Sequence, residues 1–159
     1  MSDHFPAEIH IGGPIPRAAL PGLFHAICAE GASLKDYDGP QATEESLEDA
    51  FREGQIVHLY DTQACGGQFD ALEAFLVEHH IHFGRHNDAY CEFDAENVYY
   101  RGEGEPLVTP ADQNGNRLVP CSDVLEILDG SSDTEAKLNA IRNLVDPPQA
   151  RPLTPIRFE

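Results

Sequence analysis

Residues 56–85, IVHLYDTQACGGQFDALEAFLVEHHIHFGR, decide which fold the sequence predicts. The stretch opens with the alternating segment IVHLYD, residues 56–61, which is typical of a half-buried strand. After a Gly-Gly pair, apolar residues recur at helical spacing through GGQFDALEAFLVEHH, and the stretch ends on a second alternating segment, IHFGR. Strand, glycine loop, helix and strand in this order predict one β-α-β-type unit.

A fainter copy of this unit lies 49 residues earlier in the chain. AEIHI at residues 7–11 alternates like a strand, residues 16–30 have helical spacing, and SLKDY at 33–37 is expected to be extended. The shift pairs Leu20 with Phe69, Leu23 with Leu72, Ile27 with Leu76, Gly31 with His80 and Leu34 with Phe83. Two such units predict an α+β fold of the ferredoxin-like sandwich kind, in which a mixed or antiparallel sheet has helices on one face.

This pseudo-repeat suggests a division of the chain. Residues 1–101 are predicted to form an α+β core domain, with further strands at AYCEF (89–93) and NVYYR (97–101). Residues 102–159 are predicted to add a hairpin at Asn114-Gly115, two short helices and a proline-rich extended tail, all packed on the same domain. Ser122 is expected to cap the first of these helices and Asp133 to start the second.

Charge is the most unusual property of the composition. The 159 residues include 28 acids and 10 bases, for a net charge of −18. Such a surplus repels phosphates and anionic lipids, so direct nucleic-acid binding and membrane binding are not expected. No leader and no apolar run of about 18 residues is visible, and a cytoplasmic protein is expected. In that compartment the scattered cysteines should be reduced thiols. The oligomeric state stays open.

The histidines suggest a metal site. Strand alternation points His10, His58 and His82, together with Glu92, to the sheet face away from the helices. Three or four such ligands suit zinc or another divalent ion, in a metal-binding protein or a metal-dependent hydrolase. Without a metal, these side chains form a solvated face that should protonate readily among so many acids. His80 is instead expected at a helix end, in the left-handed conformation of its counterpart Gly31.

Cys65 is a candidate nucleophile. The run DTQACGGQFD places it between a strand and the start of a helix, where free backbone N–H groups and the helix dipole stabilise a thiolate. Gly66 and Gly67 would let an anion approach the backbone. A thiol enzyme is therefore one alternative, although no sequence motif identifies its base.

Residues 112–123 resemble the calcium loop of EF-hand and dockerin-type proteins, with oxygen-bearing side chains at positions 1, 3, 5 and 12. Arg117 replaces the glycine expected at position 6, and Asp123 replaces the final glutamate. The Asn-Gly hairpin accounts for the same residues without calcium.

An acidic helix is predicted over residues 43–53, between the two units. Leu47, Ala50 and Phe51 form one apolar edge, which should pack against the protein and leave the acids exposed. The predicted interaction surface consists of Asp36, Asp38, Glu44, Glu45, Glu48 and Asp49. The function that best fits the sequence is accordingly a binding or regulatory module for a basic protein partner, without resident cofactor and without enzymatic activity.

Overall fold

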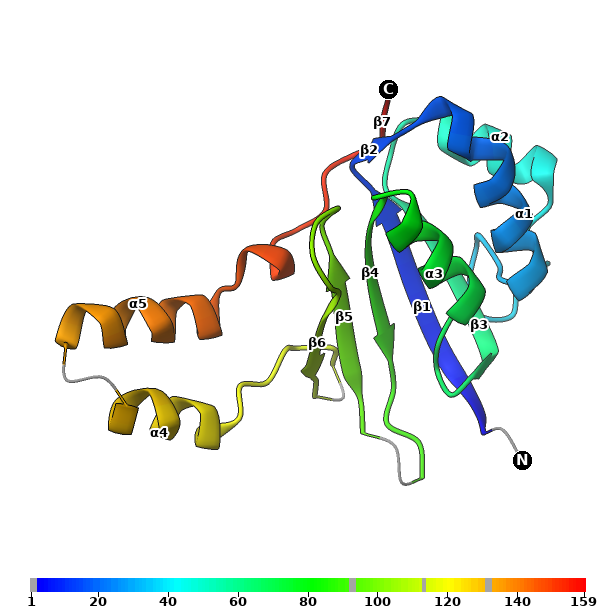
Figure 1. The fold of residues 1–159 in the computed structure, drawn as a ribbon. Coiled ribbons are helices and arrows are strands. Elements are labelled where there is room, and N and C mark those ends of the chain that lie inside the picture. Colours follow the sequence, from blue (N-terminus) through cyan, green and yellow to red (C-terminus); the bar gives the residue numbers. More distant parts are fainter. Residues whose placement is uncertain (1–2, 92–93, 113, 131–132) are drawn as a thin grey trace.

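The computed structural model describes residues 3–91, 94–112, 114–130 and 133–159. Its main feature is a five-stranded antiparallel sheet in the order β3-β1-β4-β5-β6. The strands are β1 (His4–Gly12), β3 (Val57–Cys65), β4 (His82–Asn87), β5 (Glu96–Tyr100) and β6 (Leu107–Pro110). The helices α1 (Leu20–Glu30), α2 (Glu44–Arg52) and α3 (Asp70–Glu78) lie on one face of it (Figure 1). The predicted α+β class is therefore confirmed.

The core lies between this sheet and the helices. On β1 the alternation is strict, because Ile9 and Ile11 are fully buried while Glu8 and His10 are only partly covered. Leu23 and Ile27 of α1, and Leu72 and Leu76 of α3, are also completely buried. The apolar positions that suggested the pseudo-repeat thus pack into one core.

The chain reverses twice around β1. After α1 it turns back through α2, so β3 returns antiparallel to β1. It then crosses the sheet through α3 to β4, on the other side of β1. Since β3 and β4 both run antiparallel to β1, they are parallel to each other. Of the extended segment predicted at 33–37, Ser33 forms isolated bridges with Tyr60 and Gln41.

Helix ends in the two units have matching conformations. Gly31 ends α1 with φ 76°, and His80 follows α3 with φ 56°. The prediction that His80 adopts the left-handed conformation is confirmed. Thr43 caps α2 through a reciprocal capping box with Ser46, which fixes where the acidic helix begins.

The strand predicted at 89–93 is wrong where the structure describes it. Cys91 is exposed and lies in a turn with φ 52°, which is not a strand conformation. β5 pairs directly with the end of β4, where Asn87 lies opposite Glu96. Residues 92–93, and with them Glu92, lie outside the described residues.

Beyond β6, the chain forms a helical hairpin that projects away from the sheet (Figure 1). It consists of α4 (Cys121–Gly130) and α5 (Thr134–Val145), and neither helix has a buried residue in the part that the structure describes. Asp133 caps α5 by accepting from the N–H groups of Glu135 and Ala136, as predicted. Ser122, the predicted cap of the first helix, lies inside α4 instead.

After α5, the C-terminal tail runs back to the part of the protein that contains the sheet. Its last strand, β7 (Arg157–Phe158), pairs in parallel with β2 (Pro14–Ile15), and Ile156 is buried in the core. No helix within the described ranges is long and apolar enough to cross a membrane.

Candidate functional site

The outer face of the sheet brings two of the predicted metal ligands together. His10 on β1 lies opposite His58 on β3, and their rings stack with centroids 4.0 Å apart. Both side chains point away from the helices, as the alternation predicted. Glu8 lies on the same face, with its Oε1 3.7 Å from His10 Nε2. That distance is too long for a hydrogen bond.

His82, another predicted ligand, does not join this pair. The His82 ring packs against Gly13 and Gly102, where an added Cβ would come within 2.6 and 2.9 Å of it. Glu92 is not among the described residues. Across the described ranges, no group of three or more His, Cys, Asp and Glu side chains is arranged to hold a metal ion.

The net negative charge of the chain does not raise the pKa of His58 or of His82. Burial and the neighbouring His10 hold the pKa of His58 below its ordinary value, and Glu8 only partly opposes them. The pKa of His82 is lowered by burial and by Arg101. For these two residues the expected easier protonation is wrong, because adjacent groups and desolvation outweigh distant, screened charges.

A neighbouring part of this face is also polar. His86 lies opposite Glu8, and its Nδ1 is 2.7 Å from Asn97 Oδ1. Asn97 in turn donates to the carbonyl of Gly115 (2.8 Å), which brings the Asn114-Gly115 turn over the sheet. In that turn Asp112 accepts from the N–H groups of two loop residues. The carboxylate of Asp112 thus holds the turn together by binding N–H groups of the turn itself.

Cys65 is exposed at the end of β3, beside a hollow of about 620 Å³. Phe5, Gln68, Asn87 and Glu96 contribute to the lining. The two glycines that follow Cys65 both have left-handed backbone conformations. The strand-to-loop position predicted for this cysteine is therefore observed.

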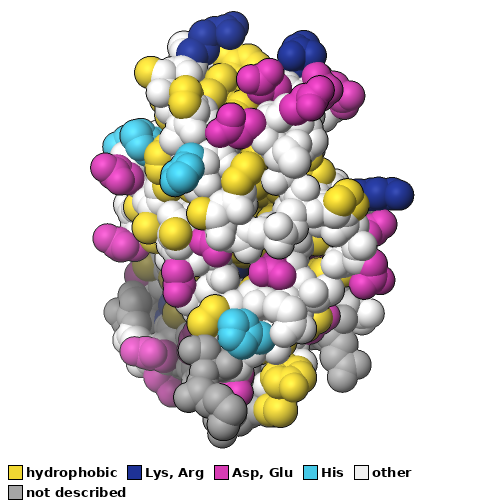
Figure 2. Space-filling view, turned by 90° about the vertical axis from the view of Figure 1, so that its right-hand side faces the viewer, with side chains coloured by type: hydrophobic (Ala, Val, Ile, Leu, Met, Phe, Trp, Pro, Cys, Tyr) yellow, Lys and Arg dark blue, Asp and Glu magenta, His cyan; other side chains and the backbone are white. Residues whose placement is uncertain are grey.

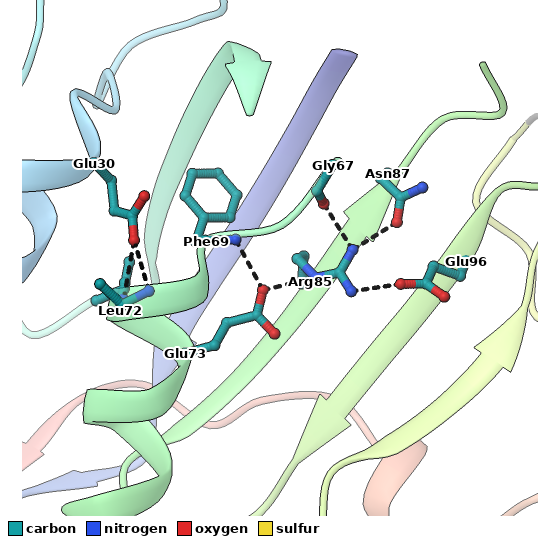
Figure 3. Close-up of polar contacts among 9 residues, drawn as sticks. Glu30, Gly67, Phe69, Leu72, Glu73, Arg85, Asn87 and Glu96 are labelled. Atoms are coloured by element: carbon teal, nitrogen blue, oxygen red, sulfur yellow. Dashed lines mark hydrogen bonds and ion pairs between the residues drawn. The ribbon is translucent and has the colours of Figure 1, made fainter. Parts of the chain in front are cut away.

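The helix donors that were expected to stabilise a Cys65 thiolate have other partners. Glu30 Oε1 accepts from the N–H groups of Ala71 (3.0 Å) and Leu72 (3.1 Å) at the start of α3. Glu73 Oε1 accepts from the Phe69 N–H (3.1 Å). Figure 3 shows these carboxylates at the helix N-terminus. Since the donors are occupied by carboxylates, they lend no support to an activated thiol.

Arg85 is a buried charged residue that the sequence patterns did not single out. Its side chain is only 2% exposed and lies on the helix-covered face of β4. The guanidinium donates to Gly67 O (2.8 Å), Asn87 Oδ1 (2.6 Å) and Glu96 Oε1 (2.5 Å). Its Nε forms an ion pair with Glu73 Oε1 at 2.8 Å (Figure 3). The alternation of β4 could have indicated this burial. Residues two apart on a strand point to the same face, so an inward Phe83 places Arg85 inward as well.

This network links the Gly-Gly loop, α3, β4 and β5. Burial raises the pKa of Glu73, and the charge of Arg85 opposes that rise. The two carboxylates compensate the buried charge of Arg85, and three of its N–H groups donate to Gly67, Asn87 and Glu96. The network therefore holds one wall of the hollow beside Cys65 in place.

The predicted acidic surface is exposed as expected. All six of its carboxylates lie on the surface, while Leu47 and Phe51 of α2 are buried beneath them. Asp49 forms an exposed ion pair with Arg52, at 2.6 Å. Such a pair contributes little to stability, although it neutralises one of the acids.

A groove of about 480 Å³ runs beside this surface, between α1, α2 and the end of the tail. Phe24 and Phe51 meet there edge to face, with ring centroids 5.2 Å apart. Arg17 lies over the Phe158 ring at 5.0 Å. Figure 2 faces this side of the molecule and shows acidic side chains gathered next to apolar surface. The groove is lined by Arg17, Leu20, Pro21, Phe24, Glu44, Glu48, Phe51, Arg52 and Phe158.

No family model, curated protein or solved structure matches this chain. Any functional assignment therefore depends on the residues themselves.

Proposed function

We propose that the protein is a binding module for a basic protein partner, which it holds in the groove between α1 and α2. One observation supports this function above all. An apolar floor that includes Leu20, Phe24 and Phe51 lies directly beside the exposed carboxylates of Glu44 and Glu48. An apolar side chain of the partner would occupy the floor, while its flanking Lys or Arg residues would pair with the acids.

The bases that line the groove do not cancel this preference. Arg52 is paired with Asp49, and Arg17 stacks on Phe158. Glu44 and Glu48 have no such basic partner among the described residues, in a chain whose net charge is −18. Burial of the partner's apolar side chain in the groove would supply affinity. The carboxylates of Glu44 and Glu48 would supply selectivity and faster association.

A short labelled peptide with one central phenylalanine flanked by lysines would test the groove. We expect fluorescence anisotropy to show saturable binding that weakens as salt rises. E44Q/E48Q should weaken binding about three- to tenfold, as expected for losing two partly exposed charge contacts. The matched control, E103Q/E105Q, removes the same charge from an exposed loop elsewhere and should bind like the wild type. Equal losses in both variants, or no binding at all, would contradict the proposal.

The metal site at His10, His58, His82 and Glu92 and the thiol enzyme at Cys65 stay predictions. Neither has a supporting contact among the described residues comparable to the groove. We therefore advance neither as a second function.

We also propose that the α+β sheet is a ferredoxin-like sandwich whose second strand is reduced to Ser33. In support, Ser33 exchanges two backbone hydrogen bonds with Tyr60, of 2.8 and 2.9 Å, on the edge of β3. The order Ser33, β3, β1, β4 follows, and α2, β5 and β6 would be additions to that plan. Hydrogen exchange tests this idea: a Ser33 amide that exchanges as fast as an unfolded chain would rule it out.

A further inference from the structure

We propose that the helical hairpin of α4 and α5, called the arm below, is a docking face for an amphipathic basic helix. The arm is a second surface, separate from the groove between α1 and α2. Four large apolar side chains on it are about half exposed: Leu125 (57%), Leu128 (45%), Leu138 (52%) and Val145 (57%).

These four side chains lie on the same side of the arm. Each directly follows a half-buried residue: Leu125 follows Val124, Leu128 follows Ile127, Leu138 follows Lys137 and Val145 follows Leu144. Lys137 reaches the other helix, where its ammonium donates to the Leu128 carbonyl. From their partial burial we infer that the other three half-buried positions also turn towards the other helix. Both helices are right-handed and they run antiparallel (Figure 1). One step along either helix therefore turns from the shared interface to the same side of the hairpin.

The arm has little packing of its own. Helices as short as these, with ten and twelve residues, are marginal in water unless an apolar face is covered. At the base of the arm, the Arg117 guanidinium donates to the carbonyls of Leu144 (2.9 Å) and Val145. These bonds hold the end of α5 near the sheet, while the apolar face remains open. A partner that covers this face would therefore stabilise both helices.

Charge indicates which partner fits. Residues 121–146 contain six acids and two bases, a net charge of −4. One of the bases, Lys137, already donates to a carbonyl at the end of α4. A second copy of the arm would bring the same negative charge to the contact. A helix with an apolar stripe flanked by Lys and Arg would instead complement both the apolar face and the acids.

A defined probe tests the arm: a labelled 18-residue peptide of leucine and lysine, with the leucines at i, i+3, i+4 and i+7. The full chain should bind it in a saturable manner, and the double variant L125Q/L138Q should weaken binding about tenfold or more. Both positions are exposed and glutamine is a good helix former, so the fold should persist. As the matched control, V108Q changes an equally exposed apolar residue on β6 and should leave binding unchanged.

Two altered peptides check what is recognised. A peptide with glutamate in place of every lysine, and one with central prolines that prevent helix formation, should both bind at least tenfold more weakly. Amide exchange in residues 121–145 should slow when the leucine-lysine peptide is bound. Equal binding of the glutamate peptide, or unchanged exchange in the arm, would overturn the proposal.

Other outcomes distinguish the arm from the groove. If E44Q/E48Q abolished binding of the helical probe and L125Q/L138Q did not, the probe would sit in the groove and the arm proposal would fail alone. If sedimentation showed a dimer that L125Q/L138Q dissociates, the arm would be covered by a second copy, which would also overturn it. If the full chain bound the helical probe but not the short phenylalanine peptide, only the proposal for the groove would be contradicted.

Discussion

Helices α3 and α5 have similar sequence patterns but very different surroundings. Both repeat apolar residues at helical spacing, and both have acids in the first turn. In α3, Leu72 and Leu76 are fully buried against the sheet, whereas α5 has no buried residue in the described part of the chain. An amphipathic pattern thus indicates that one face will be covered, and it does not say which surface of which molecule covers it.

The same contrast holds for charged residues. The body of the protein, the sheet with α1 to α3, encloses Arg85 among carboxylates and carbonyls. The acids of the arm are exposed almost throughout. Removing a charge should therefore have a large effect in the body and a small one at the surface.

The largest effect is expected for Arg85→Ala. Removing the guanidinium leaves Glu73 and Glu96 without their shared cation and Gly67 without its donor. We expect the free energy of unfolding to fall by about 3–5 kcal/mol, measured by urea denaturation. Arg52→Ala, which breaks the exposed pair with Asp49, is the control and should cost about 0.5 kcal/mol or less. If the two variants lost similar amounts of unfolding free energy, a charged residue in the body would matter no more for stability than one at the surface.

Paired truncations of leucine compare the body with the arm directly. Leu76→Ala empties a fully buried site and should cost about 2–5 kcal/mol. Leu138→Ala on the arm removes a side chain that is 52% exposed and should cost less than about 1 kcal/mol in the free protein. Thermal or urea unfolding of both variants provides the test. A loss at Leu138 as large as that at Leu76 would mean that the arm is already covered in solution.

The smallest effect concerns the outer face of the body. The folded protein holds the pKa of His58 below 6.5, so the unfolded chain binds this proton more readily. Stability should therefore decrease as the pH falls from about 6.5 towards the folded pKa, and be fully present above that range. His58→Gln should remove this part of the decline, measured as melting temperature against pH.

A direct titration provides the control for this prediction. In an NMR titration the His58 ring of the folded protein should have its midpoint below that of a short peptide containing residues 56–61. A midpoint equal to or above that of the peptide would show that neither burial nor His10 disfavours the charged ring.

Much of the body could be predicted from residue patterns. Alternation along β1 and β3 correctly assigned His10 and His58 to the outer face, because side chains on a strand must alternate. The equivalence of His80 with Gly31 correctly predicted a left-handed residue after α3. Helix starts at Thr43 and Asp133 were recognisable from their capping side chains.

Other features depended on contacts between distant segments. His82 was predicted on the correct face, but only packing against Gly13 and Gly102 separates it from His10 and His58. Cys65 was predicted beside a helix start, but Glu30 comes from α1 to occupy the donors there. The alternation of residues within one strand contains no information about which distant segments pack against it.

The sequence by itself determined the class of the fold, the faces of the strands and the acidity of the exposed helix. These properties follow from local periodicity, helix capping and composition, which act over a few residues. Only the tertiary structure decided that Arg85 joins three elements, that Ile156 from the tail enters the core, and that the arm stays uncovered. These outcomes depend on which segments meet across the sheet, because burial and charge pairing are properties of the assembled chain.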